Sequence, residues 1–181
     1  MKADWCIRLI VVILLTAASA GCTRRLPSKD PRSTALLISE FESVKPGSPF
    51  TVGVLITLED GWHTYWKDPG DSGMAPVFEW QLPDGFTAGP VLWPEPQRLE
   101  SPPLFNYIYE NQVLLMVEIA TPEDLPVDPT VTIECDFSWL ICKDVCVVRE
   151  AKLRLVALVN AETPRPSTKW HTLFEETRKQ L

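Results

Sequence analysis

The sequence is poor in histidine and in positive charge. Only 2 of its 181 residues are histidine, and the formal net charge at pH 7 is −7. An acidic chain repels the phosphate backbone, so we expect no nucleic-acid partner. With so few imidazole groups, the sequence also gives little support for a metal centre, and we expect no resident metal or other cofactor.

Several catalytic signatures are missing from the chain. It has no phosphate-binding loop, no HExxH motif and no Ser-His-Asp arrangement. Asp68 and Asp71 lie among turn-forming residues with no second carboxylate placed opposite them, which argues against a hydrolase. Long helical patterns are also scarce, whereas there are 17 prolines and 7 tryptophans. This combination favours a β protein with many turns.

The longest apolar run, residues 9–18, follows a positively charged start, and no later run is long enough to span a membrane. Residues 1–22 are typical of a signal peptide. They end in small residues followed by Cys22, as in a bacterial lipobox, which predicts lipidation of Cys22 and attachment to the bilayer. Ser19 stands where a lipobox usually has leucine, so export without lipidation is the alternative. Residues 23–32 are expected to form a flexible tether.

Residues 33–160 alternate between β-rich segments and turn signals and predict one β-sandwich. The four prolines of residues 94–103 predict an irregular segment. A hairpin is expected around Glu110 and Asn111, between two predicted strands. The predicted strands cover residues 36–44, 50–58, 62–66, 77–81, 86–93, 106–109, 113–119, 131–141 and 147–159.

Residues 161–181 are expected to form a linker and a short C-terminal helix. Ser167 is suited to cap that helix. One face of the helix would be apolar and pack on the sandwich. Its members are Trp170, Leu173, Phe174, Thr177 and Leu181.

Cys142 and Cys146 are four residues apart within a β-rich stretch. In a straight strand such residues lie about 13 Å apart, whereas a disulfide needs Cα atoms roughly 4.4–6.8 Å apart. If the two are bonded, the chain must reverse or coil between them. Residues 143–145 suit a three-residue hairpin loop, and the apolar flanks favour strands over the alternative of a helical turn. The spacing alone is compatible with a structural staple as well as with an exchangeable bond.

An ordered set of motifs resembles the N-terminal periplasmic domain of the disulfide reductase DsbD. The motifs resemble most strongly the variant domains found in suppressor-of-copper-sensitivity relatives. The motifs are Trp62-His63-Thr64-Tyr65-Trp66, Pro69-Gly70-Asp71-Ser72-Gly73, Trp80, Leu82-Pro83, Trp93-Pro94, residues 107–111 and Trp139-Leu140-Ile141-Cys142-Lys143-Asp144-Val145-Cys146.

The resemblance implies an immunoglobulin-like sandwich with a reversible disulfide between Cys142 and Cys146, which passes electrons to periplasmic oxidoreductases. It also implies an aromatic cap or lining around the pair. Candidates for that cap are Phe105, Tyr107, Tyr109, Trp139 and Tyr65.

Two features differ from the family pattern. The family domain is usually fused to a membrane-embedded block and a thioredoxin-like domain, and neither is present in this sequence. We therefore expect the electron donor to be a separate membrane-embedded or thioredoxin-like protein. Val147 and Val148 follow the second cysteine where relatives often carry proline.

Two other functions remain open at this point. Cys142 and Cys146 could bind Cu(I), with Cys135, His63 or Met74 as a further ligand. The chain could instead be an immunoglobulin-like binding module whose disulfide is only structural. Cys135 is expected to be a buried core thiol.

Overall fold

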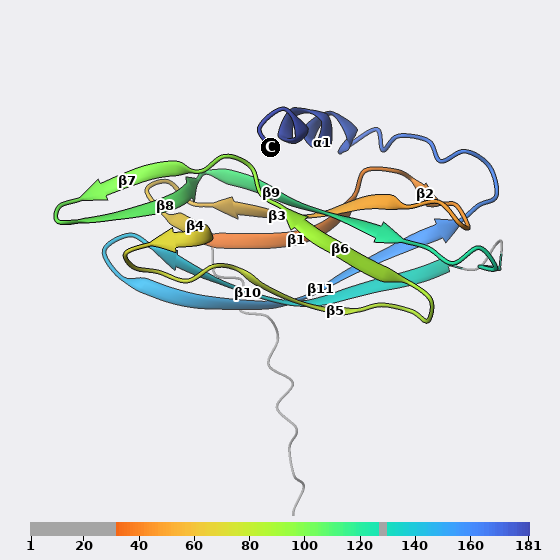
Figure 1. Cartoon of the computed structure of the whole chain (residues 1–181), viewed down its shortest axis with the longest axis horizontal. Coiled ribbons are helices and arrows are strands. Elements are labelled where there is room, and N and C mark those ends of the chain that lie inside the picture. The colour runs from red at the N-terminus through yellow and green to blue at the C-terminus, as the bar shows by residue number, and fades with distance from the viewer. Residues whose placement is uncertain (1–31, 127–129) are drawn as a thin grey trace, which may run out of the picture.

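The computed structural model describes residues 32–126 and 130–181. The predicted signal peptide, Cys22 and all but the last residue of the predicted tether lie outside the described residues. Two sheets face each other (Figure 1), and their strands pair in antiparallel fashion except for β2, which is parallel to β11. The four-stranded sheet has the order β1 (Ser33–Ser39), β3 (Phe50–Leu58), β9 (Gln112–Ala120), β6 (Thr87–Leu92). The seven-stranded sheet has the order β2 (Ser43–Val44), β11 (Cys146–Val159), β10 (Thr130–Cys142), β4 (His63–Gly70), β8 (Leu104–Glu110), β7 (Gln97–Ser101), with β5 (Val77–Gln81) also paired to β10.

The predicted immunoglobulin-like sandwich with a short C-terminal helix is confirmed. Its main core forms where inward-facing side chains of the two sheets meet, as period-2 alternation requires. Val52, Val54 and Ile56 of β3 are fully buried in this core, opposite Ile133 and Phe137 of β10. None of the helices among the described residues is both long and apolar enough to cross a bilayer.

The helix α1 (His171–Arg178) covers the outer face of the four-stranded sheet (Figure 1). Phe174 is completely buried in a second cluster with Leu55 and Met116. This contact explains why Leu55 is buried, although it belongs to the outward-facing set of β3. The prediction that Ser167 caps the helix was wrong, because α1 begins at His171 and its N-cap is Trp170, without a side-chain cap hydrogen bond. The Ser167 hydroxyl accepts a hydrogen bond from the backbone N–H of Trp170 at 3.3 Å in the turn that precedes the helix.

Two sequence predictions about the chain between β6 and β9 were wrong. Residues 94–103 contain a regular strand, β7, because the prolines lie on either side of Gln97–Ser101 and the strand is at the sheet edge. The segments around Glu110 and Asn111 do not form a hairpin, because β8 and β9 belong to different sheets. Asn111 adopts a φ of 58° where the chain crosses between them.

The longest pairing in the molecule joins β10 and β11. All thirteen residues of β10 pair with β11, from Thr130 opposite Leu158 to Cys142 opposite Cys146. This hairpin runs along the whole sheet (Figure 1). The cysteine pair therefore lies at the closed end of a long, regular ladder.

A buried carboxylate connects α1 to the sandwich. The Glu40 side chain is 3% exposed and accepts hydrogen bonds from the Arg178 guanidinium, one of them from Nη1 at 2.8 Å. The hydrogen bond to Glu40 is the main reason that the pKa of Arg178 is raised. A charge buried in this way is stable only with its partner in place.

We expect Glu40→Gln to lower the free energy of unfolding by about 1–3 kcal/mol. The cost is below that of a fully buried pair because the Arg178 side chain is 38% exposed. Denaturant unfolding would measure it. Glu175→Gln is the matched control, since Glu175 also pairs with Arg178 but is 51% exposed, and about 0–0.5 kcal/mol is expected there. Equal effects of the two variants would contradict this account of helix docking.

Candidate thiol–disulfide site

Cys142 and Cys146 are joined by a disulfide, with their Cα atoms 4.1 Å apart. Cys142 ends β10, Cys146 begins β11, and the three residues between them form the hairpin loop predicted from the sequence. Within the loop, the backbone N–H of Lys143 donates a hydrogen bond to the carbonyl of Val145 at 3.2 Å. The Lys143 ammonium donates to the carbonyl of Asp60 at 3.1 Å, which ties the loop to the turn before β4.

The two sulfur-bearing residues differ in their access to solvent. Cys142 is only 3% exposed, whereas Cys146 is classed among the exposed residues. Two apolar neighbours of Cys146 are also open to solvent, with Val145 58% and Val148 52% exposed. A nucleophile arriving from outside would therefore meet Cys146 first.

Cys142 is buried because its face of the sheet is covered locally by large side chains. It forms a cluster with Tyr65 of β4, Ile108 of β8 and Leu140 of β10. Leu140 precedes Cys142 by two residues, so both project to the outer face of the seven-stranded sheet. This cluster is distinct from the main core, which takes the alternate residues of the same strands.

The segment after β4 covers Tyr65. A Cβ added at Gly73, whose φ is 95°, would lie 2.2 Å from the Tyr65 ring, so only glycine permits this approach. Asn106 holds the segment in place. Its side-chain amide donates to the carbonyls of Pro69 at 2.9 Å and Ser72 at 2.6 Å, and its oxygen accepts from the Ser72 hydroxyl at 3.1 Å. The sequence reasoning missed Asn106, whose role depends on contacts with residues more than thirty positions away.

The predicted cap residues occupy different places. Tyr65 contacts the cluster around Cys142. Phe105, Tyr107 and Tyr109 lie on the face of β8 opposite Ile108, because side chains alternate along a strand. Tyr107 packs edge-on against Trp66 at 5.6 Å between ring centroids.

Two of these residues have defined core contacts. Tyr109 is buried in the main core, and its hydroxyl donates to the carbonyl of Pro94 at 2.6 Å. Trp139 lies in the same core, stacks on Phe137 and donates from its indole nitrogen to the Ser33 hydroxyl at 3.2 Å. A role for the aromatic residues in capping the disulfide remains a prediction.

Cys135 is a buried free thiol, as the sequence suggested. It is 0% exposed in the main core, and burial raises the pKa of its thiol to about 11. Seven residues of extended strand, roughly 23 Å, separate it from Cys142, so it cannot share a ligand set with that cysteine. Within residues 32–126 and 130–181, no three His, Cys, Asp or Glu side chains group in a way that could hold a metal.

His63 is closer to the disulfide than the sequence indicated. Its pattern between aromatic residues suggested a packing role, and its ring does contact Tyr65 edge-on at 5.4 Å between centroids. It is also the direct cross-strand partner of Cys142 on one side and of Glu110 on the other. Burial lowers the pKa of His63 below its usual value, and the charge of Glu110 opposes this shift.

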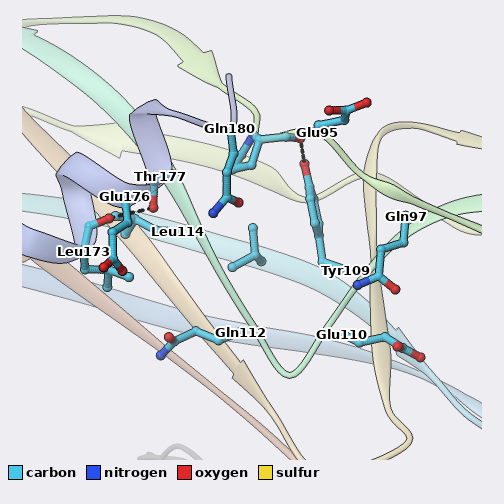
Figure 2. Close-up of a pocket in the computed structure, with 12 residues that line it drawn as sticks. Glu95, Gln97, Tyr109, Glu110, Gln112, Leu114, Leu173, Glu176, Thr177 and Gln180 are labelled. Carbon is cyan, nitrogen blue, oxygen red and sulfur yellow. Dashed lines mark hydrogen bonds between the residues drawn. The ribbon is translucent and has the colours of Figure 1, made fainter.

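A polar pocket of about 290 Å³ lies between α1 and strands β8 and β9 (Figure 2). The side chains of Tyr109 and Glu110 point in different directions along its border (Figure 2). Neither Cys142 nor Cys146 lines the pocket. The lining residues are Pro94, Glu95, Gln97, Tyr109, Glu110, Gln112, Val113, Leu114, Leu173, Glu176, Thr177 and Gln180.

Comparison with known proteins identifies one family model and similar solved structures. The family model described as "Thiol:disulfide interchange protein DsbD, N-terminal" matches residues 35–158. The N-terminal periplasmic domain of ScsB from Proteus mirabilis is 18% identical with a TM-score of 0.55, over 82% of this chain and 52% of that one. This chain thus spans about half the length of the ScsB chain. The reduced DsbD N-terminal domain from Neisseria meningitidis is 13% identical with a TM-score of 0.40, over 79% of this chain and 96% of that one. No match is found among the curated proteins.

The chain is an immunoglobulin-like sandwich that carries a disulfide at the end of a hairpin. With the family model matching residues 35–158, the chain belongs to the DsbD N-terminal domain family, as its motifs suggested. Membership in this family implies thiol–disulfide exchange, and the Cys142–Cys146 disulfide needed for such exchange is present.

We expect Asn106→Ala to loosen the segment that covers Tyr65. Three hydrogen bonds of a buried side chain would be lost, so the free energy of unfolding should fall by about 2–4 kcal/mol. Amide hydrogen exchange of residues 69–74 should become faster. Ser72→Ala is the control, because only the bond from the Ser72 hydroxyl disappears, and about 0.5–1.5 kcal/mol is expected. Unchanged exchange in Asn106→Ala would show that Asn106 does not hold the segment.

Proposed function

We propose that this chain is an exported, periplasmic electron-relay domain. It takes reducing equivalents from a separate membrane-embedded or thioredoxin-like donor and passes them to periplasmic oxidoreductases through Cys142 and Cys146. The observation that carries the proposal is that the solvent-exposed residue Cys146 is bonded to a buried Cys142 at a hairpin end. Thiol–disulfide exchange needs one accessible sulfur and a second cysteine that can leave and later return.

The disulfide contributes little that the fold does not already have. It closes a loop of three residues, and short loops give the smallest entropic stabilisation. The thirteen-residue pairing of β10 with β11 already brings the two cysteines face to face. A bond that is dispensable for the ladder can open and close without unfolding the domain, as a relay requires.

Cys146 is the sulfur that a partner thiolate attacks. Its own exposure and the apolar surface of Val145 and Val148 beside it suit a partner whose reactive thiol is surrounded by apolar residues. Attack at Cys146 makes Cys142 the leaving group. The burial of Cys142 beneath Tyr65 then keeps the departing sulfur close enough to re-form the bond.

Lipidation at Cys22 would hold the domain at a membrane surface, with residues 23–32 as a tether. The periplasmic setting is supported by the description of the ScsB domain as periplasmic. Cu(I) binding by the reduced cysteines and a purely structural disulfide are the alternatives. The distance of Cys135 from the pair counts against the first, because it removes one of the proposed ligands.

Trapping of mixed disulfides tests the proposal. Reduced Cys142→Ser, which keeps the exposed Cys146, should form a mixed disulfide with the oxidised active site of a thioredoxin-like protein. Cys146→Ser keeps only the buried Cys142, and it should react at least about tenfold more slowly. Mass spectrometry of the adducts identifies the bonded cysteine and excludes Cys135. Equal rates would refute attack at Cys146, and failure of both variants to react would indicate a structural disulfide.

A further inference from the structure

Four side chains from four neighbouring strands form one row across the outer face of the seven-stranded sheet. Cys146 of β11 lies opposite Cys142 of β10, Cys142 opposite His63 of β4, and His63 opposite Glu110 of β8. Directly opposed residues project to the same face, with Cβ atoms about 4.5–5.5 Å apart. The row therefore places an imidazole next to the disulfide and a carboxylate next to the imidazole.

One side of this row is closed to water. The next row of residues on the same face, two positions away along β10, β4 and β8, is buried. It consists of Leu140, Tyr65 and Ile108. The His63 ring packs edge-on against Tyr65. In such surroundings the interaction between an imidazole and a neighbouring sulfur anion is screened less than at an open surface.

Few other titratable groups surround His63. Burial raises the pKa of Tyr65, so its phenol stays neutral near pH 7. The ammonium of Lys143 is held by the Asp60 carbonyl. His171, the only other histidine of the sequence, is on α1. The strand register and the loop contact place four charged or titratable residues nearest to His63 on its face of the sheet: Tyr65, Glu110, Cys142 and Lys143. Asp60 and Asp144 lie beside them in the turn before β4 and in the hairpin loop.

We propose that His63 is the proton donor and acceptor for Cys142 during exchange, and that Glu110 is the positioning residue that orients the imidazole and favours its protonated form. The inference rests on the proposed exchange function and extends it. The chemistry follows the logic of a nucleophilic cysteine paired with a histidine that is oriented by a third group.

The step can be written with its atoms and electrons balanced. A thiolate of a partner dithiol attacks the Cys146 sulfur, an S–S bond forms between them, and the Cys142–Cys146 bond breaks. The electron pair of that bond passes to the Cys142 sulfur, which becomes a thiolate, and His63 supplies its proton. The second partner thiolate then displaces Cys146, so the partner becomes a disulfide and two electrons have entered this chain. In the reverse direction His63 removes the proton from Cys142.

The first test needs no variant. The two histidines of the sequence can be titrated by NMR in the oxidised and in the chemically reduced protein. A proton shared between Cys142 and His63 makes the two groups titrate as a coupled pair once the disulfide is reduced, so the pH profile of the His63 signals should differ between the two forms. His171, on α1, is the internal control, because its signals should not differ between the two forms. An unchanged His63 titration would overturn the proposal.

The second test measures how the rate of disulfide reduction by dithiothreitol depends on pH. Each rate is divided by the concentration of dithiothreitol thiolate at that pH, which gives a corrected rate. For the native protein the corrected rate should rise as pH falls through the His63 midpoint, because imidazolium protonates the leaving sulfur. His63→Gln should abolish this rise, and below the midpoint its corrected rate should be at least about tenfold lower than that of the native protein. His171→Gln is the matched control. Coincident profiles for the native protein and His63→Gln would contradict the inference.

Glu110→Gln separates positioning from structure. Loss of the carboxylate removes a charge that favours imidazolium, so the midpoint of the corrected profile should move to lower pH while the rise itself persists. An unmoved midpoint would remove Glu110 from the account. Both tests use a chemical reductant, so they report on His63 even if no protein partner exchanges with the disulfide. Failure of the relay would appear instead in the trapping experiment.

Discussion

The pairing of β10 with β11 is the constraint on which the site depends. Because the ladder runs without interruption from Thr130 opposite Leu158 to its closed end, Cys142 must face Cys146 whenever the hairpin is formed. The disulfide does not create this proximity but uses it. A sulfur pair held by backbone hydrogen bonds can be oxidised or reduced while the surrounding sheet stays paired, which is the property an electron carrier needs.

The sheet also gives the two cysteines different surroundings. At the β4 and β8 side, Tyr65 and Ile108 bury Cys142, whereas β11 leaves Cys146 open to solvent. The same strands bring His63 into register with Cys142. Strand β11 thus provides the accessible cysteine, while β10 provides the protected cysteine and β4 the imidazole. A purely structural staple would need none of this asymmetry.

Much of the fold could be predicted from local patterns. Strands β3 and β5 match their predicted bounds, and the three-residue loop between the cysteines was expected, because alternation and turn residues act over a few positions. The wrong assignments depended on distant contacts. Strand β7 is tolerated among prolines because it lies at the edge of its sheet, and the chain after Glu110 forms no hairpin because β9 joins the other sheet. The row containing His63 was beyond sequence reasoning because it requires the register between segments about eighty residues apart.

A redox equilibrium of the protein in thiol–disulfide buffers tests the relay most directly. Thiols would be trapped by alkylation and assigned by peptide mass, so that Cys135 is counted separately from the pair. The account predicts that the thiols of Cys142 and Cys146 appear together at potentials of roughly −120 to −270 mV, the range of known exchange proteins. A pair that stays oxidised below about −300 mV would contradict it and identify the bond as structural. A protein isolated with reduced cysteines and bound copper would favour metal binding instead.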